Sequence, residues 1–382
     1  MNESTKKGTT ALKRTAFYNY HLEHDGQMVD FAGWEMPIRY SSIHEEHHTV
    51  RNGAGIFDVS HMGRLKFTGL HARRFLERML TRRISDMKPN TCRYALICNE
   101  DGGVLDDVIL YRFTDQWMLV VNASNREKII AHFQGHIGDM KVKMEDQTES
   151  IAMVAIQGPK VMELIGDYSK EIPTLKRYSF CEKNLLILKL VFSRTGYTGE
   201  DGVEVMLSAR MASQAIKMLL KDKGDVESQI RPAGLGARDT LRMEAGMPLY
   251  GHELSEQIDP LTAGLGWAVS LDKDQDTDYG EPERFIGQDA LRKISEQGVT
   301  KKLIGLKLDG RRTARQGAKV SLGDQVVGEV TSGCLSPTLG YPIAMAYVSP
   351  EHSEEGTSLT VEVGKSGADA LVVPMPFYKR PK

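Results

Sequence analysis

Six short apolar runs separated by turn residues follow residue 300, and no other feature of the chain constrains its fold as strongly. The runs are LIGLKL, AKVSL, QVVGEV, IAMAYV, SLTVEV and ALVVPM. Short, evenly spaced strands are typical of a small β-barrel or sandwich. We therefore predict a separate C-terminal domain, a small β-barrel or sandwich, over residues 300–382.

The chain before residue 300 has a different pattern, in which strands alternate with a few helices. The runs that predict strands are RLKF, VLDDVILYRF, QWMLVV, IAMVAI, LLILKLVF and VEVML. The segments HARRFLERML, REKIIAHFQGHI and ASQAIKMLLKD carry apolar residues at helical spacing. Because regular βαβ alternation is missing, we predict an α+β fold with mixed antiparallel sheets and flanking helices over residues 12–285. The acidic stretch LDKDQDTDYGEPE predicts an exposed connection to the barrel.

Composition excludes several classes of function. The 382 residues carry a net charge of −2, which gives no reason to expect a nucleic-acid partner. The longest apolar stretch, around residues 185–192, is interrupted by Lys189 and is far shorter than the roughly 20 residues of a membrane span. The N-terminus lacks an apolar signal core, and four scattered cysteines without a CxxC pair suit reduced thiols. We expect a soluble cytoplasmic protein with no nucleic-acid or membrane partner.

The string HEEHH contains an H-E-x-x-H pattern formed by His44, Glu45 and His48. In zinc hydrolases this spacing places two histidines one helical turn apart, and the glutamate activates water. A third ligand is also needed, and the nearest candidate, His61, lies in what reads as a strand or loop. We therefore interpret HEEHH as an exposed polar helix face and expect no metal.

Two groups of carboxylates interrupt predicted strands. In SRTGYTGEDGVEV, Glu200 and Asp201 lie in a glycine-rich loop and Glu204 lies in the strand that follows. On composition alone, a tight hairpin with solvated acids is the favoured interpretation. In VLDDVIL, the adjacent acids Asp106 and Asp107 point to opposite faces of a strand, so that one is buried or faces a cavity. Alternation does not decide which of the two this is.

Ten strings together carry a resemblance to a known family. They are FAGWEMPIRY, GIFDVSHMG, NEDGGVLDDVILY, VVNASN, AIQGP, SRTGYTGEDGVEV, GLGARDTLRMEAGMPLYGHEL, TAGLGWAV, VTSGCLSPTLG and PFYKR. In this order they resemble the aminomethyltransferases, the tetrahydrofolate-dependent T proteins of the glycine cleavage system. The resemblance runs from about Leu12 to Arg380. Each string is weak alone, whereas ten in one order are specific.

The resemblance implies a three-lobed arrangement, with a folate-binding body of two interleaved subdomains and the C-terminal barrel. It implies a transferase of glycine catabolism and one-carbon metabolism. An aminomethyl group on the lipoyl arm of H protein is transferred to tetrahydrofolate, ammonia leaves, and neither a metal nor a covalent enzyme nucleophile is needed. Two alternatives share the scaffold. One is a folate-dependent demethylase, and the other is a non-enzymatic folate-binding paralogue with a cysteine in place of Gly196.

The resemblance also assigns roles to individual residues. Glu204 is expected to bind the 2-amino-pyrimidinone edge of the pterin, since a rigid carboxylate accepts two parallel N–H donors. Asp107, the second acid of its pair, is expected to be catalytic. The further folate-site residues are Tyr197, Arg238, Tyr94, Met62, Trp267 and Arg380. Several of these assignments have simple alternatives: an ion pair with Asp239 or another acid for Arg238, a frayed basic end for Arg380, and plain core packing for Tyr94, Met62 and Trp267.

Overall fold

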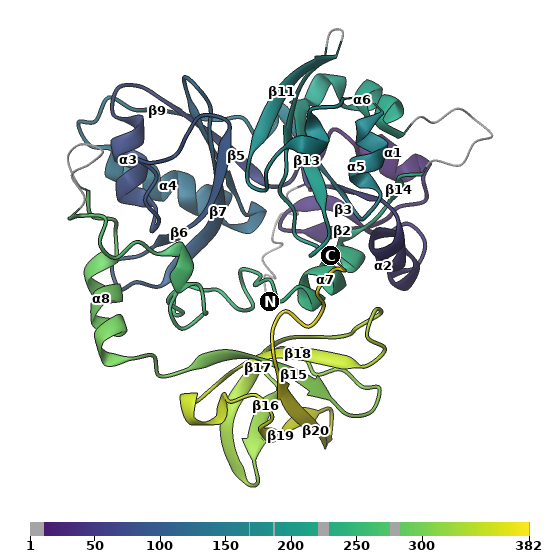
Figure 1. Ribbon diagram of the computed structural model, residues 1–382, viewed down its shortest axis with the longest axis vertical. Coiled ribbons are helices and arrows are strands. Elements are labelled where there is room, and N and C mark those ends of the chain that lie inside the picture. Colours follow the sequence, from purple (N-terminus) through teal and green to yellow (C-terminus); the bar gives the residue numbers. More distant parts are fainter. Residues whose placement is uncertain (1–10, 168, 186–187, 221–228, 276–282, 382) are drawn as a thin grey trace, which may run out of the picture.

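The computed structural model describes residues 11–167, 169–185, 188–220, 229–275 and 283–381. Three lobes surround a common centre in Figure 1, two above and the barrel below. The α+β class and the C-terminal barrel are therefore confirmed. No helix in these ranges is long and apolar enough to cross a membrane.

The first lobe is built on a five-stranded antiparallel sheet of order β6-β7-β8-β5-β9. Its strands are β5 (Gly63–Thr68), β6 (Thr91–Cys98), β7 (Val104–Arg112), β8 (Trp117–Val121) and β9 (Lys143–Asp146). Helices α3 (Ala72–Met79) and α4 (Arg126–Ile137) cover the sheet. Phe67, Phe75 and Phe133 bring these elements together, with ring centroids 5.6 to 6.1 Å apart. Aromatic packing of this kind ties both helices to the sheet.

The second lobe is built on a six-stranded sheet of order β11-β12-β13-β10-β4-β14. Its strands are β4 (Gly55–Asp58), β10 (Ile151–Gln157), β11 (Phe180–Leu185), β12 (Leu188–Ser193), β13 (Gly202–Ser208) and β14 (Arg231–Pro232). A small sheet beside it contains β1 (Lys13–Arg14), β2 (Gln27–Phe31) and β3 (Trp34–Arg39). The helices are α1 (Tyr18–Glu23), α2 (Ile43–Asn52), α5 (Val161–Gly166), α6 (Ala212–Leu220) and α7 (Leu235–Glu244).

The two upper lobes are connected through the chain path and through a shared core. All five strands of the first lobe lie between β4 and β10, which are neighbours in the sheet of the second lobe. Tyr111 of β7 and Phe180 of β11 pack together at 5.5 Å, and Leu241 of α7 belongs to the same buried cluster. This shared core fixes the first and second lobes relative to each other.

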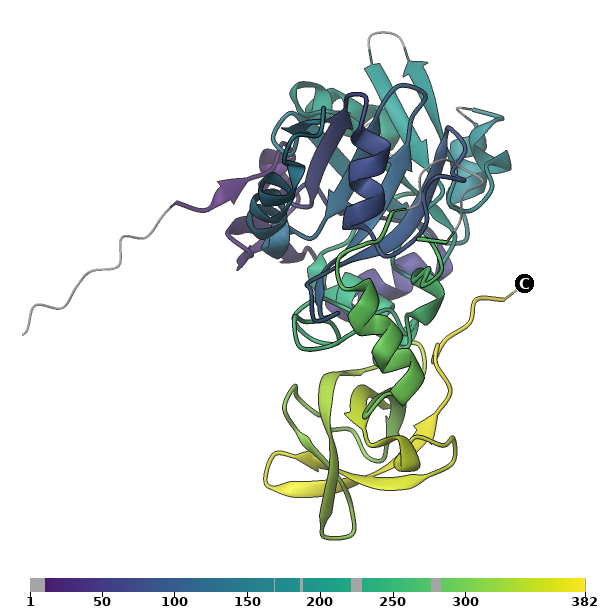
Figure 2. The ribbon, with the colours of Figure 1, turned by 90° about the vertical axis from the view of Figure 1, so that its left-hand side faces the viewer.

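Helix α8 (Gln288–Gln297) leads from the body to the barrel, as Figure 2 shows from the side. The barrel closes in the order β15-β18-β17-β16-β19-β20. Its strands are β15 (Lys302–Leu308), β16 (Lys319–Leu322), β17 (Gln325–Leu335), β18 (Pro342–Val348), β19 (Ser358–Val363) and β20 (Ser366–Val373). All six predicted runs thus form strands, while the domain limits 12–285 and 300–382 stay a prediction.

The prediction of an exposed connection before the barrel is wrong for Lys273, whereas Asp272 and Gln275 are exposed as predicted. Of this stretch, residues 276–282 lie outside the described residues. Lys273 is only 4% exposed, and its Nζ atom lies 2.7 Å from a carboxylate oxygen of Glu77 and 2.9 Å from the carbonyl oxygen of Leu80. The carboxylate of Glu77 compensates the charge of Lys273, and this contact attaches the segment around Lys273 to the first lobe.

Candidate functional site

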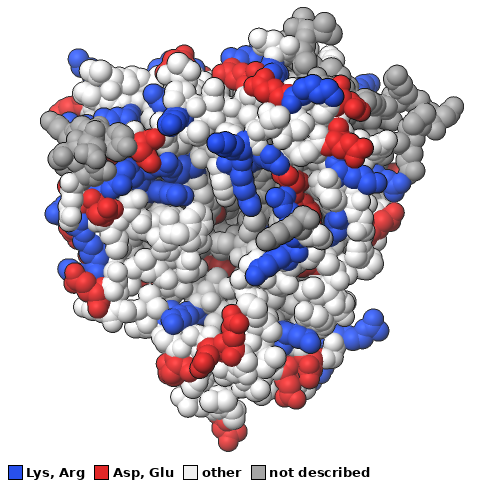
Figure 3. Space-filling view, in the orientation of Figure 1, with Lys and Arg blue, Asp and Glu red and all other residues white. Residues whose placement is uncertain are grey.

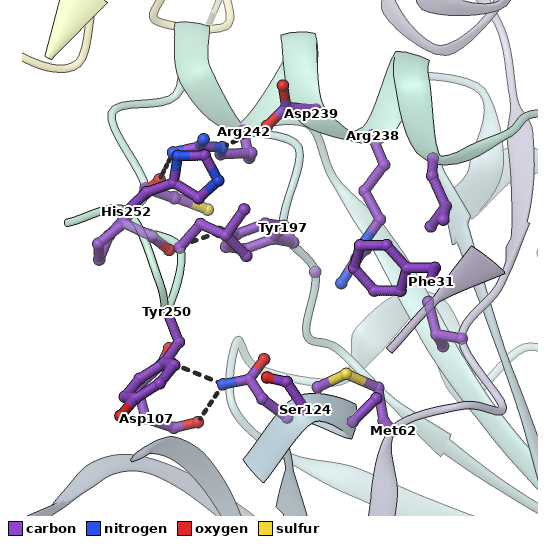
Figure 4. A pocket seen from close by; sticks show the side chains of 18 of the residues that line it. Phe31, Met62, Asp107, Ser124, Tyr197, Arg238, Asp239, Arg242, Tyr250 and His252 are labelled. Atoms are coloured by element: carbon purple, nitrogen blue, oxygen red, sulfur yellow. Dashed lines mark hydrogen bonds and ion pairs between the residues drawn. The ribbon is translucent and has the colours of Figure 1, made fainter. Parts of the chain in front are cut away.

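A cavity of about 980 Å³ lies where the three lobes meet. Figure 3 shows a hollow between the lobes on one face of the molecule, with lysine and arginine side chains beside it. The first lobe contributes residues of β6, β7 and β8, and the second contributes residues of β13 and α7. The barrel contributes Thr313, Arg315 and Gly333 to Leu335. Figure 4 shows polar side chains from several elements around the space that they enclose.

Glu204 lines this cavity from the centre of a sheet. Its strand, β13, pairs with β12 on one side and β10 on the other, opposite Ser193 and Ala155. The hydroxyl of Thr195 donates a hydrogen bond to Oε2 of Glu204. Burial raises the pKa of this carboxyl group, and Thr195 and Arg238 act against that shift. A carboxylate that is held at the centre of a sheet and faces a cavity is a fixed hydrogen-bond acceptor.

The two other acids of the glycine-rich loop are not solvated turn residues. Oε1 of Glu200 accepts a hydrogen bond of 2.9 Å from Nη1 of Arg51. Asp201 accepts two hydrogen bonds from Arg194, at 3.1 and 2.6 Å. These ion pairs fix the loop that carries Tyr197, so the hairpin with solvated acids is a wrong interpretation here.

Arg238 projects into the cavity from α7, as Figure 4 shows. Its guanidinium carbon lies 4.8 Å from the ring centroid of Tyr197, and the hydroxyl of Tyr197 donates to the carbonyl oxygen of Pro248. Asp239 accepts instead from Nε of Arg242 at 2.8 Å, so the alternative of an Arg238–Asp239 ion pair is wrong. Within the described residues, Nη1 of Arg238 is buried without a hydrogen-bond partner. Such an orphaned donor suits a ligand that brings an acceptor.

The structure distinguishes the adjacent acids of β7. Asp107 lines the cavity, whereas Asp106 is 0% exposed and faces away from it. Oδ1 of Asp107 accepts from Nδ2 of Asn122 at 2.7 Å, and Oδ2 accepts from the hydroxyl of Tyr94 at 3.2 Å. Burial raises the pKa of Asp107 to about 6, and these donors oppose it. Burial and the neighbouring Asp107 raise the pKa of Asp106, while the N–H donors of Asn122 and Asn125 favour its charged form.

Tyr94, Met62 and Trp267 also line the cavity. The rings of Tyr94 and Trp267 stack at a centroid distance of 5.3 Å, and burial raises the pKa of Tyr94 well above its usual value. Trp267 is 58% exposed, so plain core packing does not explain it. An exposed aromatic ring stacked at a cavity mouth offers a flat apolar surface to a ligand.

Arg380 differs from the expectation that it reaches the site. It does not line the large cavity but a neighbouring one of about 90 Å³. Its Nη1 atom lies 3.4 Å from Oδ2 of Asp201. The two cavities share Thr195 and Gly196 in their walls, so Arg380 lies beside the site and holds the glycine-rich loop.

The HEEHH string lies on α2, whose first turn is capped by Ser42 accepting from the backbone of Glu45. His44 and Glu45 are exposed, in accordance with the prediction. His47 and Glu46 are buried, so the interpretation as an exposed face is wrong for them. Glu46 accepts from three backbone N–H groups, and the two ring nitrogens of His47 lie 2.8 Å from the hydroxyls of Thr240 and Thr338. The described chain contains no group of three metal-capable side chains.

His61 and Asn122 are among the cavity residues that were not predicted from the sequence. His61 was weighed only as a metal ligand, yet it is 3% exposed, lines the cavity, and has an Nδ1 atom without a partner in the described chain. Burial lowers its pKa to about 4, so the ring is neutral. Asn122 lines the cavity directly after β8. Its contact with Asp107 depends on strand pairing, which no local pattern reveals.

Comparisons with known proteins match the whole described architecture. Residues 17–273 match the family model of the GCVT N-terminal domain, and residues 301–379 match that of the glycine cleavage T-protein C-terminal barrel domain. An aminomethyltransferase of Rubrobacter xylanophilus is 46% identical over 97% of this chain and 95% of its own length. One of Bacillus subtilis is 40% identical, over 97% of this chain and 100% of its own.

Among solved structures, the glycine cleavage system aminomethyltransferase T of Bartonella henselae superposes with a TM-score of 0.87. It is 31% identical to this chain, and the match covers 97% of this chain and 99% of that structure. The similarity therefore spans all three lobes.

Proposed function

Because the chain belongs to the glycine cleavage T-protein family of aminomethyltransferases, we propose that it transfers the methylene group of an aminomethyl-lipoyl H protein to tetrahydrofolate. The products are 5,10-methylenetetrahydrofolate, ammonia and dihydrolipoyl H protein. The two hydrogens that N5 and N10 of the folate lose go to the leaving nitrogen and to the sulfur. The observation that carries the proposal is that Glu204, Arg238 and Asp107 line one cavity.

Glu204 and Arg238 would hold the folate. The pterin presents two parallel N–H donors beside a carbonyl oxygen, so its edge pairs with a carboxylate next to a cationic donor. Glu204 supplies the carboxylate, and the Nη1 atom of Arg238 is a buried donor without a partner in the described chain. The stacked Tyr94 and Trp267 supply apolar surface for the rest of the molecule. The cavity of about 980 Å³ is in the size range of ligand sites.

Asp107 would act on the aminomethyl group. The carbon of this group is already activated by nitrogen and sulfur, so orientation and proton transfer supply most of the rate. An ionised Asp107 stabilises positive charge that develops on the nitrogen and accepts a proton from the reacting amine. Its pKa of about 6 places it near neutral pH, where a carboxyl group exchanges protons effectively.

The lipoyl arm of H protein would enter the cavity from the surface, with lysine and arginine side chains beside the opening (Figure 3). This partner, tetrahydrofolate as co-substrate, and a location in the cytoplasm all form part of the proposal. No step in it is assigned to a metal.

The two rival functions differ in their requirements. A cysteine at position 196 would place its Cβ atom 2.0 Å from Oε1 of Gln157, so the side chain of Gln157 would have to move before this loop could accept the residue of the non-enzymatic paralogue. A folate-dependent demethylase would retain Glu204 but would not depend on H protein.

Ammonia release from aminomethyl-lipoyl H protein tests the proposal directly. We expect release only when H protein and tetrahydrofolate are both present. Folate-dependent turnover of a methylamine or methylsulfonium compound without H protein would establish the demethylase instead. Folate binding without turnover of either substrate would favour the non-enzymatic paralogue.

A further inference from the structure

Asn122 forms an unusual set of contacts at the floor of the cavity. Its Nδ2 atom lies 2.8 Å from Oδ1 of Asp106 and 2.7 Å from Oδ1 of Asp107. The same atom lies 3.1 Å from the backbone carbonyl oxygen of Asp107. A carbonyl oxygen only accepts hydrogen bonds, so these neighbours identify this atom as the amide nitrogen. The orientation of the carboxamide is therefore determined.

The amide oxygen of Asn122 lies on the other side of the carboxamide. It accepts no hydrogen bond from the residues that the structure describes, and it is not among their buried orphaned atoms. Asn122 is only partly buried and lines the cavity. The oxygen therefore offers an acceptor to the cavity next to the carboxylate of Asp107.

Asp106 fixes this orientation from beneath. Its Oδ2 atom accepts from the backbone N–H of Asn122 at 3.0 Å, and its Oδ1 atom accepts from Nδ2 of Asn125 at 2.6 Å. Asp106 thus holds both the main chain and the side chain of Asn122, and it does not touch the cavity. A carboxylate in this position prevents the carboxamide from turning over, because the amide oxygen would then face an acceptor.

We propose that the amide oxygen of Asn122 and the carboxylate of Asp107 together bind the amino group of the substrate, and that Asp106 is a positioning residue for Asn122. The inference rests on the proposed function. Two adjacent acceptors complement a primary amine, which carries two or three N–H donors. By microscopic reversibility, ammonia occupies the same place in the reverse reaction, and it is small enough to report on this subsite alone.

The test measures the KM for ammonia in the reverse reaction, with methylenetetrahydrofolate and dihydrolipoyl H protein saturating. We expect Asn122→Ala to raise this KM about tenfold or more, because one hydrogen bond to the amine is lost. The tetrahydrofolate Kd, measured by calorimetry, should change by less than about threefold, because Asn122 is not assigned to the pterin. Asp106→Asn should raise the ammonia KM as well. The new amide at position 106 can both donate and accept, so it no longer holds the carboxamide of Asn122 in one orientation.

Asn99 provides a matched control in the same lobe. It follows β6, is partly buried, and holds a loop through a 3.1 Å hydrogen bond to the carbonyl oxygen of Glu256, yet it does not line the cavity. Asn99→Ala should lower the thermal transition and leave the ammonia KM within about twofold, as expected for a lost structural hydrogen bond. The inference would be overturned if the ammonia KM rose equally in Asn99→Ala, or if it stayed unchanged in folded Asn122→Ala.

A second variant covers a failure to fold. If Asn122→Ala shows no cooperative unfolding transition, Asn122→Ser replaces it. The serine keeps a hydroxyl donor for Asp106 and Asp107 but removes the amide oxygen from the cavity. An unchanged ammonia KM in folded Asn122→Ser would likewise overturn the inference. An unmodified protein that shows no H-protein-dependent ammonia exchange would instead defeat the proposed function. The two failures are therefore distinguishable.

Discussion

Arg238 lies across the ring of Tyr197, with 4.8 Å between its guanidinium carbon and the ring centroid. Tyr197 is itself anchored through its hydroxyl to Pro248, so the ring holds the guanidinium without occupying its Nη1 donor. A charge-assisted hydrogen bond contributes about 1.5–3 kcal/mol. We expect Arg238→Met to weaken tetrahydrofolate binding roughly ten- to a hundredfold in calorimetry. Unaltered affinity in a folded variant would show that the donor faces no ligand.

Glu204→Gln tests the opposite side of the same interaction. The change replaces one acceptor oxygen with a donor that faces a donor of the pterin, and we expect a loss of folate affinity of about ten- to a hundredfold. Glu163→Gln on the exposed face of α5 is the control and should leave the affinity unchanged. Unchanged calorimetric affinity in Glu204→Gln, with the fold intact, would place the pterin elsewhere.

Asp107→Asn should lower the turnover rate by roughly 10²–10⁴, because the charge that stabilises a cationic amine and accepts its proton is lost. Folate affinity should remain, since Glu204 binds the pterin. In the unmodified protein we expect kcat to fall as the pH decreases through about 6, where Asp107 becomes protonated. A kcat that shows no such decline between pH 7 and 5, or full activity of Asp107→Asn, would remove this acid from the mechanism.

The contrast between Asp106 and Asp107 illustrates what the sequence predicts and what it leaves open. Strand periodicity correctly places the two acids on opposite faces of β7, because successive side chains alternate. It does not state which face meets the cavity, since that depends on the pairing of β7 with β6 and β8 and on the position of α7. The strands of the barrel, in contrast, were predicted because each one is a local pattern.

Buried charges were the least predictable part of the chain. Glu46, His47 and Lys273 read as solvated polar residues, and each is buried with at least one partner far along the chain. His47 meets Thr240 and Glu244, and Lys273 meets Glu77. Local composition contains no information about partners roughly 190 positions away. A prediction based on it therefore places any charged residue at the surface.

The histidines of α2 provide a sharp test of the metal interpretation. His44 is exposed and His48 is partly buried, and they touch only each other and His47 among the ring contacts of the described chain. We expect the double variant His44→Gln, His48→Gln to retain activity within a few-fold and chelators to have no effect. Stoichiometric zinc in the purified protein that disappears in the double variant would contradict this view.

Arg51 joins α2 to the glycine-rich loop and to α7 within the second lobe through buried ion pairs, which leads to a prediction about stability. Its guanidinium lies 2.9 Å from Oε1 of Glu200 in the glycine-rich loop and 2.8 Å from Oε2 of Glu244 in α7. It also lies 3.9 Å from the ring centroid of Tyr378, in the segment that returns from the barrel. Although burial alone would raise it, the pKa of Glu244 falls to about 2, because His47, Ser336 and Arg51 hydrogen-bond to the charged form.

Removal of Arg51 would leave two buried carboxylates without their cation. We expect Arg51→Met to lower the free energy of unfolding by about 3–5 kcal/mol, as is usual when one partner of a buried ion pair is lost. The exposed pair of Lys319 and Glu329 on the barrel serves as the control, and Lys319→Met should cost less than about 1 kcal/mol. Denaturant unfolding of both variants measures the difference. An equally small loss of unfolding free energy in both variants would mean that Glu200 and Glu244 find other partners when Arg51 is absent. The glycine-rich loop would then not depend on the Arg51–Glu200 ion pair for its position beside the cavity.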